Sequence, residues 1–378
     1  MDHREVGVLV LVHDGDDDLV PLLGHQQVGA AVAGHGRRLR VVQVGLQLLE
    51  PARLGLHPSQ GSEHDDLLPP DRTGRGYAAR REPGTLPAVP NERWVAGDGV
   101  RLHAREWSSP VARGPDLLLL HGLASSSHIW DLVAPILARR GHRVVALDQR
   151  GHGRSAKPSS GYRLERFVAD SAAAIRALGL SRPILVGHSF GANVALELAH
   201  RRPRSVRGLV LLDGGFLGLR ERFDWKTARQ VLAPPDLRGT PLSEFLEFVR
   251  YELGGAIRIT PEVEAVVLSL MRVDRHGNIH PRLSRANHLK ILRALWEQDT
   301  PGLLRRVRVP TLVLAARSRD PVPDSAGFRQ EKERAASRVR AIGGHVRFEW
   351  IEGIHDVPLQ RPRAVSARIA RFAGTLVG

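Results

Sequence analysis

Short apolar runs alternate with amphipathic segments along the chain from Glu92 onward. The runs expected to form strands are 100–107, 117–120, 144–147, 184–186, 209–212, 311–315 and 346–351. Several of them are continuously apolar, which is typical of strands that are covered by helices on both faces. Strands that alternate with helices predict an α/β fold with a mostly parallel central sheet flanked by helices.

The helical segments follow a period near 3.6 residues. In one of them the apolar positions 164, 167, 168, 175 and 178 share a face, and Gly179 follows as a stop signal. A last helix at 362–372 would cover the end of the sheet.

The interval 213–309 lacks a core-strand pattern and contains only helical pieces. Thr260-Pro261 followed by two glutamates is a strong helix start, and 244–251 and 289–296 also have helical patterns. We therefore predict an inserted helical cap at 214–300, and a core domain built from 91–213 and 301–378.

Residues 1–90 differ from the rest of the chain. They contain no Lys, Phe or Trp, and Tyr77 is their single aromatic residue. The acidic run 14–18 and the breaker-rich stretches 57–62 and 71–76 are typical of loops or linkers. We expect a poorly ordered extension, or upstream DNA translated because the start site was misassigned. The first residues do not resemble a signal peptide, and we expect a cytoplasmic protein.

Composition and charge exclude several classes of function. The chain has no cysteine, which excludes disulfides, thiolate-bound metals and a thiol nucleophile. No apolar run is long enough for a membrane span. The net charge is +15, but lysine supplies only 4 of the 55 basic residues, and the arginines are scattered among acids. We therefore expect no nucleic-acid partner, because clustered charge is the useful signal for that function.

The sharpest motif is Gly187-His188-Ser189-Phe190-Gly191. It follows an expected strand and precedes a helix-forming stretch, which is the context that a G-x-S-x-G nucleophile turn requires. Ser189 is the candidate nucleophile, exposed at a helix start where backbone N–H groups stabilise developing negative charge.

A serine needs a base, and the base needs an orienting group. His355 follows the strand 346–351 and Asp320 follows the strand 311–315. The order Ser189, Asp320, His355 is one in which catalytic triads occur, and open α/β sheets place their sites at these strand ends. Asp213, after the strand 209–212, is a real rival because it could also reach the base, but we prefer Asp320 on the chain order.

An oxyanion hole needs two donors. The backbone N–H of Phe190 follows the nucleophile, and the N–H of Leu123 lies in the turn after the strand 117–120. His121 in that turn is expected to be a structural hydrogen-bonding residue. The histidines at 276, 280 and 288 form no convincing metal pattern, and no nucleotide-binding loop is present, so we expect neither a metal nor a cofactor.

Five motifs in this order resemble those of the alpha/beta-hydrolase superfamily, in its cap-bearing branch that carries a His-Gly turn. They are the segments 121–122, 148–155, 187–191, 320–323 and 353–355, and the resemblance covers about 92–372. That branch includes carboxylesterases, lipases, cofactor-free haloperoxidase-like enzymes, C–C bond hydrolases, enol-lactonases, epoxide hydrolases and dehalogenases. The last two use an aspartate nucleophile, whereas this chain has Ser189. Where the family commonly shows a glycine-and-acid turn, the chain has Ala316-Arg317-Ser318-Arg319.

The resemblance implies a serine hydrolase that cleaves a small or medium carboxylic ester through an acyl-enzyme. C–C bond or enol-lactone hydrolysis and perhydrolysis by the same triad remain open, as does a non-catalytic ligand-binding protein that kept the fold. The expected partner is a small-molecule substrate in a mostly apolar pocket under the cap. Seven apolar cap residues are considered as a lining, although ordinary core packing is the expected role for any one of them: Phe223, Trp225, Phe245, Phe248, Leu270, Met271 and Trp296. The sequence does not give the oligomeric state.

Overall fold

The computed structural model describes residues 10–13, 19–22, 89–108, 113–318 and 326–377. Within the first 90 residues, β1 (Val10–His13) pairs in antiparallel fashion with β2 (Leu19–Leu22). The prediction for the remainder of 1–88 lies outside the described residues.

An eight-stranded sheet organises the described chain from residue 91 onward. Its spatial order is β13-β12-β8-β7-β5-β6-β4-β3; β3 and β4 pair in antiparallel fashion, as do β4 and β6, and the other pairs are parallel. The strands are β3 (Asn91–Ala96), β4 (Arg101–Trp107), β5 (Leu117–Leu120), β6 (Val144–Leu147), β7 (Ile184–His188), β8 (Gly208–Leu212), β12 (Thr311–Arg317) and β13 (Val346–Glu352). The predicted fold class, a mostly parallel sheet flanked by helices, is confirmed.

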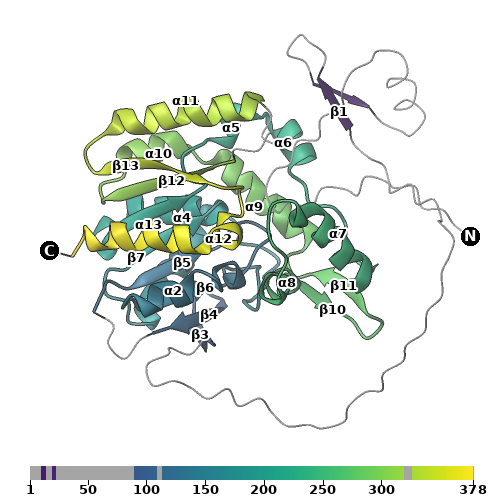
Figure 1. Ribbon diagram of the computed structural model, residues 1–378, viewed down its shortest axis with the longest axis horizontal. Coiled ribbons are helices and arrows are strands. Elements are labelled where there is room, and N and C mark those ends of the chain that lie inside the picture. The colour runs from purple at the N-terminus through teal and green to yellow at the C-terminus, as the bar shows by residue number, and fades with distance from the viewer. Residues whose placement is uncertain (1–9, 14–18, 23–88, 109–112, 319–325, 378) are drawn as a thin grey trace, which may run out of the picture.

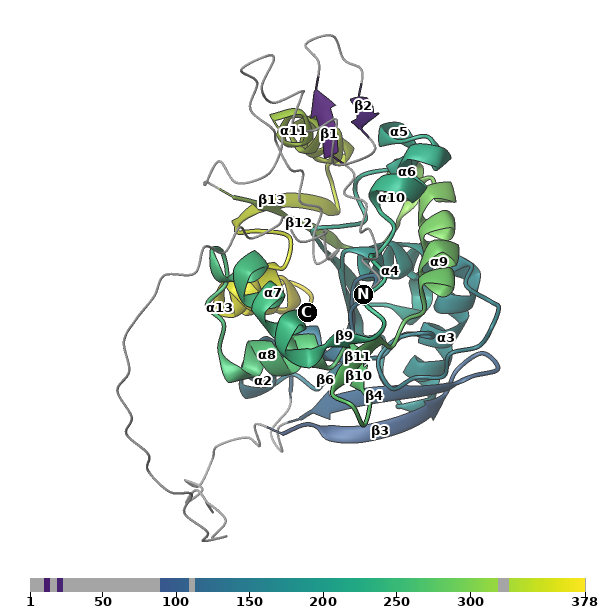
Figure 2. The same ribbon diagram turned by 90° about the vertical axis from the view of Figure 1, so that its right-hand side faces the viewer.

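Helices cover both faces of this sheet (Figures 1 and 2). One face packs against α3 (Leu164–Ala177), α4 (Phe190–Arg201), α10 (Thr300–Arg306) and α11 (Ala326–Ile342). The other face packs against α2 (Ala134–Arg139) and α13 (Pro362–Gly374). Along β5, Leu118 and Leu120 belong to the first core, whereas Leu117 and Leu119 belong to the second. The continuous leucine run is thus explained by burial on both faces. Short helical turns lie between the longer elements: η1 (Ser127–Trp130), η2 (Pro203–Ser205) and α12 (Val357–Gln360).

The segment between β8 and α10 holds several helices and a small sheet beside the carboxyl ends of the strands (Figure 2). Its helices are α5 (Leu219–Arg222), α6 (Trp225–Val231), α7 (Leu242–Gly254), α8 (Pro261–Leu268) and α9 (Arg285–Glu297). The side chain of Thr260 caps α8 by accepting the N–H of Val263, as the sequence predicts. A three-stranded antiparallel sheet of β9 (Thr240–Pro241), β10 (Met271–Val273) and β11 (Asn278–Pro281) is present as well. The sequence analysis did not predict it, because each of its strands has only two to four residues.

No helix in the described ranges combines the length and the apolar character that crossing a bilayer would need.

Candidate active site

Ser189 sits at the turn between β7 and α4 with φ 53° and ψ −123°. A positive φ is strained for a residue with a Cβ, and strain of this kind collects at functional sites. Three of the four non-glycine residues with positive φ in the described chain are Ala124, Ser189 and Asp213, and all three line one pocket. The backbone is therefore distorted around a single place in the fold.

The glycines near Ser189 are required by close backbone approach. A Cβ on Gly187 would overlap the backbone of Gly191 and Ala192, and a Cβ on Gly191 would overlap the carbonyl of Leu120. A Cβ on Gly214 would overlap the backbone of Ser189 itself. This crowding packs the turn tightly against β5 and the end of β8, and so holds the serine in its strained conformation.

The partner of His355 is Asp213. Its Oδ2 lies 2.6 Å from the Nδ1 of His355, and the aspartate directly follows β8. Asp213 is the rival considered in the sequence analysis; Asp320, which was preferred there, lies outside the described residues. The chain order that favoured Asp320 says nothing about which strand end lies nearest the histidine.

Asp213 is buried but surrounded by donors. Its side chain is 2% exposed and also accepts the N–H of Ala316 at 2.9 Å and the ammonium of Lys332 at 3.2 Å. Burial raises the pKa of the Asp213 carboxyl, but the charge of Lys332, the contact with His355 and the Ala316 N–H outweigh it. The net pKa lies well below the ordinary value, so the group is a carboxylate at neutral pH.

His355 responds to the same charges. Burial lowers the pKa of its imidazole, but the hydrogen bond and charge of Asp213, with the charge of Asp356, raise it above the ordinary value. With Nδ1 bound to Asp213, Nε2 is the ring nitrogen that remains to exchange a proton. No hydrogen bond within the described chain occupies that nitrogen, and His355 lines the same pocket as Ser189.

The two predicted oxyanion donors also border this pocket. Phe190 is the first residue of α4 and Leu123 follows the His-Gly turn after β5. Within the described ranges no acceptor is assigned to either N–H. Both N–H groups are therefore without an acceptor in the described chain, at residues that line the same pocket as Ser189, and they stay candidates for an oxyanion hole.

His121 has the structural role that the sequence analysis gave it. Its Nδ1 donates to the carbonyl of Gly122 at 2.8 Å, and its Nε2 accepts the N–H of Gln149 at 3.0 Å. The amide of Gln149 donates back to the His121 carbonyl at 2.7 Å. Burial lowers the pKa of His121, which fits a neutral ring that fixes the turn carrying Leu123.

A cavity of about 610 Å³ opens above Ser189. Leu219, Phe223, Leu232, Leu292 and Leu295, from α5 to α9, line one part, and Glu252, Gly255, Ala256 and Leu270, from α7 to β10, line another. Phe223 and Leu270 were among seven apolar residues of the insertion considered as a possible lining. The other five, Trp225, Phe245, Phe248, Met271 and Trp296, do not border the cavity.

Sequence reasoning missed two residues that contact Asp213 or His355. Lys332 contacts Asp213 from α11, as described above. His188 donates from Nε2 to the carbonyl of His355 at 2.9 Å, and its ring lies 4.8 Å from the His355 ring. Burial and the charge of His355 lower the pKa of His188 to about 3, so it remains neutral and holds the His355 backbone. His188 occupies the second position of the nucleophile motif, which was the available signal.

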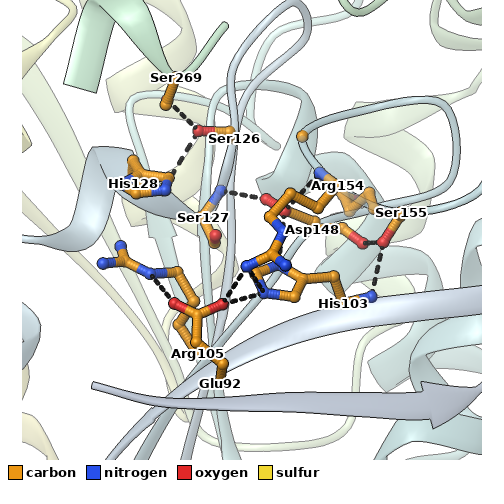
Figure 3. Close-up of polar contacts among 12 residues, drawn as sticks. Glu92, His103, Arg105, Ser126, Ser127, His128, Asp148, Arg154, Ser155 and Ser269 are labelled. Atoms are coloured by element: carbon orange, nitrogen blue, oxygen red, sulfur yellow. Dashed lines mark hydrogen bonds and ion pairs between the residues drawn. The ribbon is translucent and has the colours of Figure 1, made fainter. Parts of the chain in front are cut away.

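Figure 3 shows a second polar network, which is centred on Asp148. Asp148 accepts the N–H of Ser127 at 2.7 Å, the N–H of Arg154 at 2.9 Å and a bond from the Nδ1 of His103 at 2.8 Å. His103 also contacts Glu92 through Nε2. Asp148 thereby joins the loop after β6 to the loop that follows the oxyanion turn.

Comparison with known proteins agrees with this architecture. Residues 115–248 match the family described as the alpha/beta hydrolase fold. The chain is 32% identical over 225 residues to 2-(acetamidomethylene)succinate hydrolase of Mesorhizobium japonicum, covering 58% of this chain and 75% of that protein. A crystal structure of E-2-(acetamidomethylene)succinate hydrolase superposes with a TM-score of 0.60 at 23% identity, covering 75% of this chain and 99% of that one.

Other relatives match only in part. Epoxide hydrolase B of Mycobacterium tuberculosis is 39% identical over 122 residues, which is 32% of this chain and 34% of that enzyme. The chain thus spans about a third of the length of that relative. Together with the fold and the strained serine turn, these matches define the class: the chain belongs to the alpha/beta-hydrolase family, a family of hydrolases.

Proposed function

We propose that this protein is a serine hydrolase that cleaves a small or medium carboxylic ester through an acyl-enzyme. Ser189 is the nucleophile, His355 the general base and Asp213 the group that orients it. The observation that carries the proposal is the 2.6 Å contact between Asp213 and His355 at the pocket that Ser189 lines. No cofactor is needed for this chemistry.

The proposed reaction has two stages, acylation of the serine and release of the acyl group by water. The Oγ of Ser189 attacks the ester carbonyl carbon while its proton passes to Nε2 of His355. The N–H groups of Leu123 and Phe190 hold the negative oxygen of the tetrahedral intermediate. When the intermediate collapses, His355 returns the proton to the leaving alcohol and the acyl group stays on Ser189. Water, deprotonated by His355, then releases the acid and restores the serine.

The substrate is expected to be apolar near the scissile bond. Leucine and phenylalanine side chains supply much of the cavity wall, and a cavity of about 610 Å³ is in the usual size range for small-molecule sites. Epoxide hydrolysis is not proposed despite the partial match to epoxide hydrolase B, because that branch of the family uses an aspartate where this chain has Ser189.

A second candidate is hydrolysis at an unsaturated acid derivative, as the name of the Mesorhizobium relative indicates for that protein. The same triad would serve, because the nucleophile, base and oxyanion donors are shared. Pocket shape rather than the triad would separate the two reactions.

The test is labelling with a fluorophosphonate, with the modified residue located by mass spectrometry. We expect a single adduct on Ser189. Ser189→Ala should lower turnover of a short p-nitrophenyl ester by a factor on the order of 10⁴–10⁶. Ser205, a half-buried residue of η2 that does not border the cavity, supplies the control, and Ser205→Ala should retain the activity. A Ser189→Ala protein with undiminished turnover would remove this residue from the mechanism.

A further inference from the structure

Lys332 contacts Asp213, the proposed triad acid, from α11, a helix that lies outside the five sequence motifs. It lies in the first half of α11, and its side chain is only 8% exposed. The ammonium lies 3.2 Å and 3.4 Å from the two oxygens of Asp213 and 3.1 Å from the carbonyl of Ala316. The three N–H donors of the ammonium therefore have three acceptors around them.

The residue type fits this place. A lysine ammonium is a compact charge with three donors, whereas an arginine presents a wide planar fork. Lysine is rare in this chain, with 4 residues among 55 basic ones, and Lys332 is buried against the triad acid. The ammonium places its three donors around one point, which suits the three acceptors that surround Lys332.

Four titratable groups lie around His355. Asp213 follows β8, Asp356 follows His355 itself, Lys332 lies on α11 and His188 ends β7. The two aspartates raise the pKa of His355, and the Lys332 charge lowers it. Lys332 is thus the positive charge that limits how strongly Asp213 holds the proton on the imidazole.

We propose that Lys332 is a positioning residue of the triad: it fixes the Asp213 carboxylate beside Ala316, and its charge opposes the protonation of His355 that Asp213 favours. Lys332 touches no reacting atom and acts only through Asp213. The catalytic part of this inference rests on the proposed function. The effect of the Lys332 charge on the pKa of His355 is a property of the protein without substrate.

The experiment compares Lys332→Met with the wild-type protein. The rate of Ser189 labelling by a fluorophosphonate, measured from pH 5 to 9, falls on the acid side as His355 becomes protonated. In Lys332→Met the unbalanced Asp213 charge should move this acid limb upward by on the order of one pH unit. Lys332→Arg keeps the charge and should restore much of the wild-type position.

Two controls separate this role from a purely structural one. Lys290→Met removes an exposed lysine that binds Ser159 and Asn287, and it should leave the acid limb unchanged. If Lys332→Met does not fold, Lys332→Gln keeps a polar contact without the charge and takes its place. A lowered Tm together with an unmoved acid limb would overturn the proposal.

A second measurement needs no reaction at all. The imidazole of His355 can be titrated by NMR in protein carrying ¹⁵N-labelled histidine, with His355→Asn used to assign the signal. The His355 pKa should rise in Lys332→Met and return toward wild type in Lys332→Arg; equal values in all three proteins would refute the inference. If Ser189 is never labelled, the proposed function fails, and this titration still decides the role of Lys332.

Discussion

In the described part of the chain, two histidines contact a buried aspartate through Nδ1, and only one of these pairs borders the cavity. Asp213 meets the Nδ1 of His355 at 2.6 Å, and Asp148 meets the Nδ1 of His103 at 2.8 Å. Burial alone would raise the pKa of both carboxyls, but in each case the histidine and other donors bring it well below the ordinary value. The two pairs therefore have similar contact distances, and the carboxyl pKa is lowered in both.

The difference lies at the second ring nitrogen. The Nε2 of His103 contacts Glu92, so each of its two ring nitrogens contacts a carboxylate. The His103 side chain is fully buried, and its ring lies among these carboxylates and away from the cavity (Figure 3). His355 is held on one side only, in a pocket shared with Ser189. An aspartate therefore makes a histidine into a base only where the opposite nitrogen is kept for the reactant.

The largest expected effect is that of His355→Gln, which is compared with His103→Gln. Without the imidazole, Ser189 has no proton acceptor, and the ester turnover should fall by a factor on the order of 10⁴–10⁶. The fold should remain, because His355 is partly exposed at the pocket edge. Steady-state kinetics together with circular dichroism measures both effects.

His103→Gln is the matched control. It should lower the thermal stability, because Asp148 loses a buried partner, while the folded protein keeps its turnover. If His103→Gln loses as much activity as His355→Gln at an unchanged Tm, the proposed distinction between the two histidines is wrong.

The next effect concerns the acid. Asp213→Asn removes the charge that orients and stabilises the His355 imidazolium, and kcat should fall by about 10⁴. Asp320→Asn, assayed beside it, should cost much less. A larger loss for Asp320→Asn would mean that the acid favoured by chain order takes part in the reaction and that the Asp213 contact is not the productive one.

Most of the sheet could be predicted because its strands are continuous apolar runs. β5 and β6 have the predicted bounds, and β7, β8, β12 and β13 differ by one or two residues at an end. β3 was missed because it is an edge strand in which only Val95 is buried, so its pattern has little apolar signal.

The site was predictable only in part, for reasons of topology. Ser189 and His355 carry local motifs and could be named from the sequence. The acid could not be decided, because the sequence does not show that β8 lies between β7 and β12 in the sheet. That order puts Asp213 at the end of the strand beside the nucleophile. Lys332 comes from a helix without a motif, and the rarity of lysine was the one available signal.

The smallest expected effect is on stability and tests the non-catalytic pair. In Asp148→Asn, Ser127, Arg154 and His103 lose a charged acceptor at a fully buried position. Breaking a buried pair of this kind costs about 3–5 kcal/mol of unfolding free energy. Urea denaturation at pH 7 should show this loss, while the turnover of the folded protein changes little because Asp148 does not border the cavity.

The stability lost in Asp148→Asn should depend on pH, in a direction set by the lowered pKa of Asp148. A carboxyl whose pKa is lowered by folding stabilises the protein above its unfolded pKa of about 3.9, and that contribution disappears as the pH falls below this value. The pKa of Asp148 is lowered in this way. The stability difference between the wild-type protein and Asp148→Asn should therefore be largest near neutral pH and shrink between pH 4 and the acid unfolding transition. A difference that stays constant over this range would mean that Asp148 stabilises the loops through its shape and hydrogen bonds and not through its charge.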